Sequence, residues 1–308
     1  MWTFKILILL CFGSLAPALA QNFYDEDPHI MELTPKSFEK VIHRTNYTTI
    51  VEFYAPWCGY CQQLKKTMKK AARNLEGVLQ VAAVNCDLAK NKQICAQNKV
   101  QGFPTLMVYR PPKVDVSKPF DRRINLDNHA SEIYKGERKL APIVDFALSR
   151  MKNYVKRLLN INKLNAVFDK ASRPSVVLFS KKDKLSPVYK SIALDWLGVL
   201  DCFIIPNRKV QSLNDDDNLA KTHPKIFTFL QKTMPDQKGS EESLLVVFDS
   251  KNDEYHVFEG KSLVKEQIAE FLTKKFDLIP NEGPGSRRQY FLDSVKNGKN
   301  RKLKHDEL

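Results

Sequence analysis

The sequence has little cysteine and no long apolar run. Its six cysteines include a single C-x-x-C pair, and neither a second C-x-x-C nor an H-x-x-H accompanies it. Structural zinc sites use four such ligands at paired spacings, so we expect no metal site. The apolar run 6–12 is too short to span a bilayer and no later stretch is apolar enough, so the sequence predicts no membrane span.

Both ends of the chain carry targeting motifs. Lys5 precedes the apolar run 6–12, and Ala18-Leu19-Ala20 is a small-x-small cleavage site, so residues 1–20 are predicted to be a signal peptide. The last four residues form the HDEL retrieval signal, His305, Asp306, Glu307 and Leu308. Together these motifs predict the lumen of the endoplasmic reticulum, where disulfides persist, with the HDEL receptor as a partner.

The composition is that of a basic globular protein. Its 308 residues are 43% hydrophobic and 27% charged, which leaves room for two domains with buried cores. The formal net charge is +14. In a nucleus this charge would suggest nucleic acid. In the predicted lumen it indicates solubility and attraction to acidic chaperones, so we expect no nucleic-acid partner.

The first half alternates strands and helices. A continuous apolar strand, 50–54, is followed by a turn and a helix whose apolar residues recur at helical spacing. The later predicted elements are strands at 78–84, 106–109 and ending at 134–136, and a closing helix at about 141–159. This order predicts an α/β sandwich of thioredoxin type.

The second half repeats this layout without the chemistry. Its strands 176–179 and 244–248 and its last helix, 263–275, parallel elements of the first half. Superposing the strands places Lys184 and Pro187 at the positions of Cys58 and Cys61, Leu178 at that of Glu52, and Ser243 at that of Pro104. We therefore expect a redox-inactive domain retained for binding or spacing.

The chain is accordingly divided into four parts. The expected parts are a signal peptide (1–20), a catalytic thioredoxin-like domain (21–159), a redox-inactive thioredoxin-like domain (160–279), and a linker, short helix and basic tail (280–308). The long connection 111–134 is either a tolerated surface insertion or a loop that docks a partner.

Cys58 and Cys61 have the spacing and context for disulfide exchange. Exchange needs a thiolate, and the first turn of a helix directs backbone N–H groups at the sulfur of Cys58. Cys61, on the same turn, is within reach to resolve a mixed disulfide formed by Cys58.

Two further residues support this chemistry. Glu52 lies inside an otherwise apolar strand, so a buried carboxyl with a raised pKa that exchanges a proton with Cys61 is favoured over a solvent-facing glutamate. Pro104 follows Gly102-Phe103, a context suited to a cis bond. Such a turn would leave backbone groups of Phe103 free to pair with an extended substrate.

The remaining cysteines and one sequon complete the candidates. Cys86 and Cys95 are nine residues apart, and a local disulfide is favoured over two free thiols in an oxidising lumen. Cys202 has an apolar context and is expected to be a buried free thiol. Asn46-Tyr47-Thr48 is an N-glycosylation sequon.

These segments resemble the protein disulfide isomerase family. The carrying motifs are the run 51–61, which includes Ala55-Pro56-Trp57-Cys58-Gly59, then Gly102-Phe103-Pro104-Thr105 and Tyr134-x-Gly136-x-Arg138. With HDEL, the chain is similar to small fungal members that have one active and one inactive thioredoxin domain.

The resemblance implies a role for each residue. Cys58 would be the nucleophile, Cys61 the resolving cysteine and Glu52 the proton shuttle. Arg138 would be a mobile cation that tunes the pKa of Cys61, and Cys86–Cys95 a second disulfide. The residues expected to contact substrate are Trp57, Gly59, Tyr60, Phe103 and the cis-proline Pro104.

Two departures from the family pattern bear on the site. Ala83 stands where most members have a lysine that pairs with the buried glutamate, which makes Glu52 harder to ionise. Tyr60 replaces the usual histidine and supplies no charge to the thiolate of the first cysteine. We therefore expect a less oxidising dithiol, shifted toward isomerase or reductase activity. A bacterial periplasmic isomerase family also has a C-G-Y-C centre.

The leading hypothesis is an enzyme that forms, reduces or rearranges disulfides in folding secretory proteins. An endoplasmic-reticulum thiol oxidase or glutathione would be its redox partner, and electrons passing between sulfurs require no bound cofactor. The chain is expected to act as a monomer. The alternative is a chaperone or escort in which Cys58 mainly tethers clients.

Overall fold

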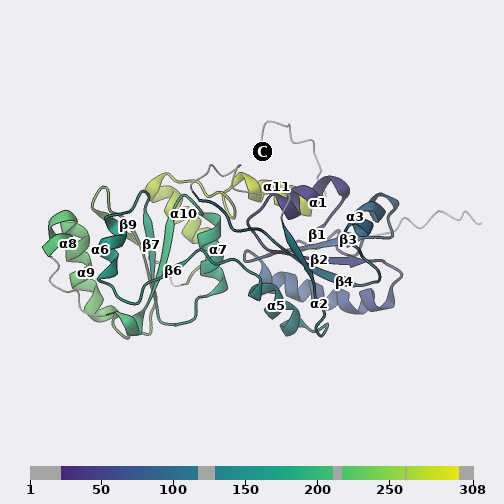
Figure 1. Cartoon of the computed structure of the whole chain (residues 1–308), viewed down its shortest axis with the longest axis horizontal. Helices are drawn as coiled ribbons and strands as arrows, with labels where there is room; N and C mark the ends of the chain where they lie inside the picture. Colours follow the sequence, from purple (N-terminus) through teal and green to yellow (C-terminus); the bar gives the residue numbers. More distant parts are fainter. Residues whose placement is uncertain (1–21, 117–128, 211–216, 261, 298–308) are drawn as a thin grey trace, which may run out of the picture.

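The computed structural model describes residues 22–116, 129–210, 217–260 and 262–297. The predicted signal peptide, the HDEL motif and the middle of the connection 111–134 lie outside these ranges. Figure 1 shows two lobes, each with its own sheet, and a C-terminal helix that lies over the first lobe.

The first lobe contains a five-stranded mixed sheet. Its strands, in spatial order, are β1 (Met31–Glu32), β3 (Gln80–Asn85), β2 (Thr49–Tyr54), β4 (Thr105–Arg110) and β5 (Ala130–Ile133). β1 and β2 run parallel to β3, and β4 runs antiparallel to both β2 and β5. Every residue of β2 and β3 is buried, as expected for central strands covered on both faces.

Helices cover both faces of this sheet. They are α1 (Pro35–His43), α2 (Gly59–Leu75), the short η1 (Ala89–Asn91), α3 (Lys92–Gln97) and α5 (Leu140–Ser149). One apolar core lies under α2 and α5, and the other lies under α1 and α3. The buried stripe of α2 includes Cys61, Leu64, Met68 and Leu75, the 3.6-residue periodicity seen in the sequence.

The second lobe repeats the sheet order with different loops. Its strands are β10 (Glu254–Val257), β9 (Leu244–Asp249), β7 (Ser175–Ser180), β8 (Asp201–Pro206) and β6 (Lys156–Arg157). Its helices are α6 (Lys163–Phe168), α7 (Pro187–Asp195), η2 (Asn207–Lys209), α8 (Asp217–Thr222), α9 (Pro224–Gln237) and α10 (Lys265–Phe276). The prediction of two tandem thioredoxin-like domains is confirmed.

The boundary between the two domains differs from the predicted one. The closing helix expected to reach residue 159 ends at Ser149, and β6 already belongs to the second sheet, so the second unit begins before residue 160. The physical reason is the placement of two apolar residues. Met151 packs in a core of the first lobe and Val155 in a core of the second, whereas a continued helix would place them on one face.

The C-terminal segment returns from the second lobe to the first. Helix α11 (Arg287–Lys296) packs Phe291, Leu292 and Val295 into the core under α1. Its N-terminal turn is capped by Ser286, whose hydroxyl accepts a hydrogen bond from the backbone N–H of Gln289. The short helix expected after the linker therefore contributes to the first domain's core.

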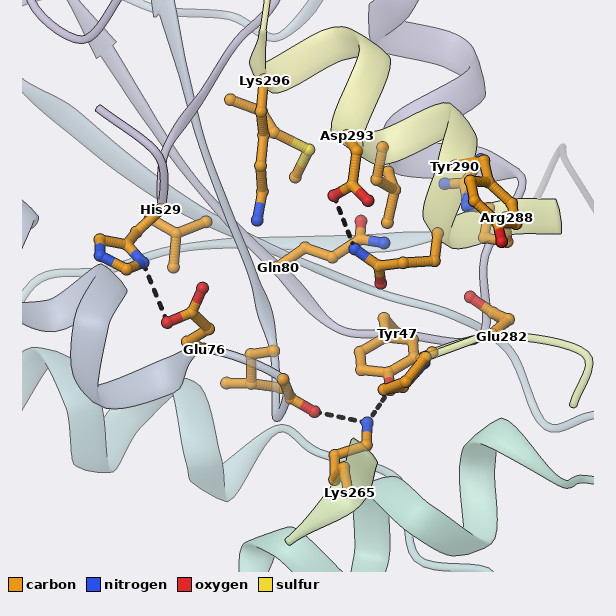
Figure 2. Close-up of a pocket in the computed structure, with 18 of the residues that line it drawn as sticks. His29, Tyr47, Glu76, Gln80, Lys265, Glu282, Arg288, Tyr290, Asp293 and Lys296 are labelled. Atoms are coloured by element: carbon orange, nitrogen blue, oxygen red, sulfur yellow. Dashed lines mark hydrogen bonds and ion pairs between the residues drawn. The ribbon is translucent and has the colours of Figure 1, made fainter. Parts of the chain in front are cut away.

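A buried polar cluster joins the two lobes. Lys265 Nζ lies 2.6 Å from Asp195 Oδ2 and 2.6 Å from the Tyr47 hydroxyl, which donates a hydrogen bond to Asp195. Glu282 accepts hydrogen bonds from the Thr45 hydroxyl and, at 2.7 Å, from the backbone N–H of Asn46. Tyr47, Lys265 and Glu282 of this cluster border a cavity of about 420 Å³ that residues of α11 also line (Figure 2).

Candidate active site

The dithiol lies at the N-terminus of α2. Cys58 is the residue before the helix, and its Sγ accepts a hydrogen bond of 3.3 Å from the backbone N–H of Cys61. The sulfur therefore replaces the oxygen that usually caps a helix. Cys58 is 7% exposed, whereas Cys61 is fully buried, so Cys58 is the cysteine that a client can reach.

Two large aromatic side chains flank the cysteines. Trp57 is 68% exposed and Tyr60 is 67% exposed. The Trp57 indole donates a hydrogen bond of 3.0 Å to Asp87, and its ring meets the edge of the Phe103 ring at a centroid distance of 6.0 Å. Exposed aromatic rings beside a reactive sulfur form a surface suited to unfolded polypeptide.

The loop before β4 faces the dithiol. The Phe103–Pro104 peptide bond is cis, and the carbonyl oxygen of Phe103 lies 3.5 Å from Cys58 Sγ. Arg138 approaches the same loop, since its Nη2 donates a hydrogen bond of 3.3 Å to the carbonyl of Pro104. Gly59 is the exposed first residue of α2 and leaves this face open.

The thiol of Cys61 is a much weaker acid than that of an ordinary cysteine. Burial is the main cause that raises the pKa of its thiol to about 12, and the hydrogen bond with Cys58 raises it further. The backbone of Ala55 opposes this shift, while the negative charge of Glu52 adds to it. Cys61 therefore needs a base nearby before it can attack a mixed disulfide.

Glu52 is a buried carboxyl whose charge acts on the Cys61 thiol. It is fully buried in β2, and its Oε2 accepts a hydrogen bond of 2.5 Å from the Tyr24 hydroxyl. Its Oε1 has no hydrogen-bond partner among the described residues. Burial raises the pKa of Glu52 to about 8; the Tyr24 hydrogen bond and the charge of Arg138 lower it, and the charge of Glu32 raises it.

The surroundings of Glu52 contain partners that sequence reasoning missed. Ala83, which stands where the family has a lysine, lies directly beside Glu52 on β3. On the other side of Ala83 lies Glu32, on β1, bound by the hydroxyl of Tyr54 at 2.7 Å. Neither Glu32 nor Tyr24 belongs to the motifs that identify the site, and only the pairing of β1 reveals them.

The second domain has no counterpart of this set. Leu178 pairs with Leu245 across β7 and β9, as Glu52 pairs with Leu106 across β2 and β4. Leu178 therefore occupies the position of Glu52. Ser243, two residues before Leu245, occupies the position of Pro104. The helix position differs from the prediction, because the turn after β7 is two residues longer. Ser186 and Tyr189, rather than Lys184 and Pro187, stand where Cys58 and Cys61 stand.

The other sequence candidates lie away from the dithiol. The structure links Cys86 and Cys95 in a disulfide and leaves Cys202 as a buried free thiol. Asn46 is 2% exposed, and its side-chain nitrogen is buried at the junction with Glu282. The Asn46 side chain is therefore buried in the folded chain, and its glycosylation stays a prediction from the sequon.

The described ranges contain neither a candidate metal site nor a candidate membrane span. Within them, no group of three histidine, cysteine or acidic side chains is placed to hold a metal ion. None of the helices in the same ranges combines the length and hydrophobicity needed to cross a membrane.

Comparisons with known proteins identify the family of this chain. Residues 29–147 match the Thioredoxin family model. The chain is 53% identical over 312 aligned positions to protein disulfide-isomerase MPD1 of Saccharomyces cerevisiae, covering 98% of each chain. It is 37% identical to human protein disulfide-isomerase A6 over 49% of this chain and 30% of that protein.

Solved structures support the fold. The crystal structure of ERdj5 form II matches with a TM-score of 0.56 at 18% identity, over 84% of this chain and 31% of that longer chain. The fold and the capped dithiol define a thioredoxin-fold thiol–disulfide oxidoreductase. More particularly, the chain belongs to the protein disulfide isomerase family and is an enzyme of thiol–disulfide exchange.

Proposed function

We propose that Cys58 and Cys61 carry out the exchange on proteins folding in the lumen of the endoplasmic reticulum. The observation that carries this proposal is the asymmetry of the pair. Cys58 is reachable and capped by a backbone N–H, while Cys61 is buried close enough to Glu52 for its pKa to respond to the carboxylate. One sulfur can attack a client and the other can release it.

The reaction has two steps. In reduction, the Cys58 thiolate attacks a client disulfide, one sulfur of the client leaves as a thiolate, and a mixed disulfide forms. Cys61 then loses its proton to Glu52 and attacks Cys58 Sγ. The bond to the client breaks, and its second sulfur leaves as a thiolate. The client gains two electrons and the enzyme pair is oxidised; oxidation of a client is the reverse.

The surrounding residues orient the client and the proton. Trp57, Tyr60 and the Phe103–Pro104 loop form the contact surface beside Cys58. Arg138 donates to the Pro104 carbonyl, and its positive charge lowers the pKa of Glu52. Through Glu52 this charge favours the ionised carboxylate that accepts the proton of Cys61.

Compartment and partners follow from the sequence motifs. The signal-peptide pattern at 1–20 and the HDEL ending favour residence in the endoplasmic reticulum, and the Cys86–Cys95 disulfide suits an oxidising lumen. The proposed partners are secretory clients, a thiol oxidase or glutathione, acidic lumenal chaperones and the HDEL receptor.

Reactivation of scrambled ribonuclease tests this function. Cys61→Ser retains the attacking sulfur but loses the resolving one. We expect reactivation to fall by about tenfold or more, with mixed disulfides trapped at Cys58. Reactivation equal to that of the wild type would instead support the escort role, in which Cys58 only tethers clients.

A further inference from the structure

Two buried acidic residues lie in one row across the first sheet. The register pairs Glu52 of β2 with Ala83 of β3, and Ala83 with Glu32 of β1. Residues paired in register across a sheet project from the same face, so the two glutamates share a face with the small Ala83 between them. The row therefore has a second carboxyl and no cation at the central position.

A tyrosine before β1 binds both carboxyls. The Tyr24 hydroxyl donates to Glu52 Oε2 at 2.5 Å, and its backbone N–H donates to Glu32 Oε1 at 3.0 Å. Tyr54 donates its hydroxyl to the same Glu32 oxygen at 2.7 Å and accepts from the backbone N–H of Phe23 at 2.7 Å. Residues 23–24 thus connect the two glutamates in one hydrogen-bonded network.

We propose that Tyr24 and Glu32 control, in opposite directions, when Glu52 can accept the proton of Cys61. Tyr24 favours the carboxylate by donating a hydrogen bond to it. Glu32 opposes the carboxylate by placing a second negative charge in the same buried region. The inference rests on the proposed proton transfer from Cys61 to Glu52, and it assigns both residues positioning roles, since neither touches the reacting sulfurs.

Charged groups on the neighbouring elements act on this pair unequally. Burial raises the pKa of Glu32 to about 7; the bonds from Tyr54 and Tyr24 and the charge of Lys65 lower it, while that of Asp25 raises it. Arg138 lowers the pKa of Glu52, which is about 8. Both glutamates thus have raised pKa values, and the negative charge of Glu32 raises the pKa of Glu52.

The region is also open to solvent on the side of Glu32. A cavity of about 160 Å³ is lined by Tyr24 and Glu32, together with the charged residues Asp25, Lys90 and Lys296. Glu32 is partly exposed, whereas Glu52 is fully buried. Glu32 can therefore exchange protons with bulk solvent, and its charge changes the pKa of Glu52.

The chemical step determines the sign of the effect. In resolution the S–H bond of Cys61 breaks and its proton goes to the Glu52 carboxylate. Cys61 Sγ bonds to Cys58 Sγ, and the client sulfur leaves as a thiolate. Only ionised Glu52 accepts the proton, so the rate rises with pH through the pKa of Glu52. Below that pKa, a downward shift of one unit speeds the step about tenfold.

The test is a pH–rate profile for loss of a glutathione mixed disulfide preformed at Cys58 of the mature chain. Glu32→Gln removes the opposing charge, so we expect its midpoint to fall by about one unit from about 8 and its rate at pH 7 to rise about fivefold. Tyr24→Phe removes the hydrogen bond, so its midpoint should rise and its rate at pH 7 should fall.

Three further variants make the outcome decisive. Glu32→Asp retains the charge and should retain the wild-type midpoint. Glu39→Gln removes a charge from an exposed position of α1 and is the matched control, with no expected shift. A purely structural role would lower the rate at every pH without moving the midpoint, and midpoints unchanged in both Glu32→Gln and Tyr24→Phe would overturn the inference.

Glu52→Gln separates this inference from the function on which it rests. If the variant retains the wild-type pH profile, Glu52 is not the base and the proposed proton transfer is wrong. If it loses the pH dependence while Glu32→Gln and Tyr24→Phe retain the wild-type midpoint, the transfer holds and only the control by Glu32 and Tyr24 is wrong.

Discussion

The turn from β2 into α2 and the turn from β7 into α7 have the same cap and different chemistry. Cys58 Sγ accepts from the Cys61 N–H at 3.3 Å, and Ser186 Oγ accepts from the Tyr189 N–H at 3.1 Å. Both helices therefore have a capped N-terminus. Both domains therefore retain the helix cap, but only the first domain has a sulfur atom in that cap.

The strands beneath these helices differ in the same way. Glu52 occupies the position that Leu178 occupies in the second domain, and both are buried. A carboxyl in an apolar core destabilises the fold unless it has a function or a partner. The second domain has leucine there, as expected for a core without proton transfer.

The largest expected effect comes from exchanging the two caps. Cys58→Ser retains a capping oxygen and removes the nucleophile, so ribonuclease reactivation should fall by about a hundredfold or more. The matched variant Ser186→Cys adds a sulfur without Glu52, a second cysteine or the cis-proline loop, and should leave activity unchanged. A gain of activity in Ser186→Cys would break the comparison.

The next effect concerns the junction that holds the domains together. Lys265→Met leaves Asp195 buried without its cation, at an expected loss of about 3–5 kcal/mol in the free energy of unfolding. Lys274→Met breaks an exposed pair with Glu270 and is the control, with no expected change in the urea midpoint. A normal midpoint in Lys265→Met would show that the cluster does not stabilise the junction.

The third effect is the pH dependence of stability that comes from Glu52. The pKa of Glu52 is raised from 4.5 to about 8 in the folded state, so folding stability decreases as pH rises across this window, by about 1.4 kcal/mol per unit. Urea unfolding should therefore show wild type losing stability relative to Glu52→Gln from pH 4.5 to 8. Leu178→Glu should introduce a similar decrease in the second domain, and pH-independent differences would contradict this account.

The smallest effect concerns the redox poise of the dithiol. Tyr60→His places a charged group beside the Cys58 sulfur and should stabilise its thiolate, making the pair more oxidising by roughly 30 mV for each pKa unit. The measurement is equilibrium with glutathione buffers, wild type against the variant. Equal potentials would remove Tyr60 as the reason for a less oxidising centre.

Sequence reasoning was strongest where chemistry depends on neighbours along the chain. The spacing of Cys58 and Cys61, the turn before the helix and the apolar strand around Glu52 are local patterns. It was weakest where the structure depends on the length of a turn or on contacts between residues distant in sequence. The end of α5 depends on which core receives Met151, and the cap at Ser186 depends on two extra residues in a turn.

By itself, the sequence determined the dithiol, its strand and helix, and the loss of this chemistry in the second half, because each depends on residue type at a fixed local spacing. Tertiary structure decided the rest. It placed Glu32 and Tyr24 beside Glu52, buried Asn46 at the domain junction and returned α11 to the first core. These contacts join residues distant in sequence, and no local pattern of residue types specifies them.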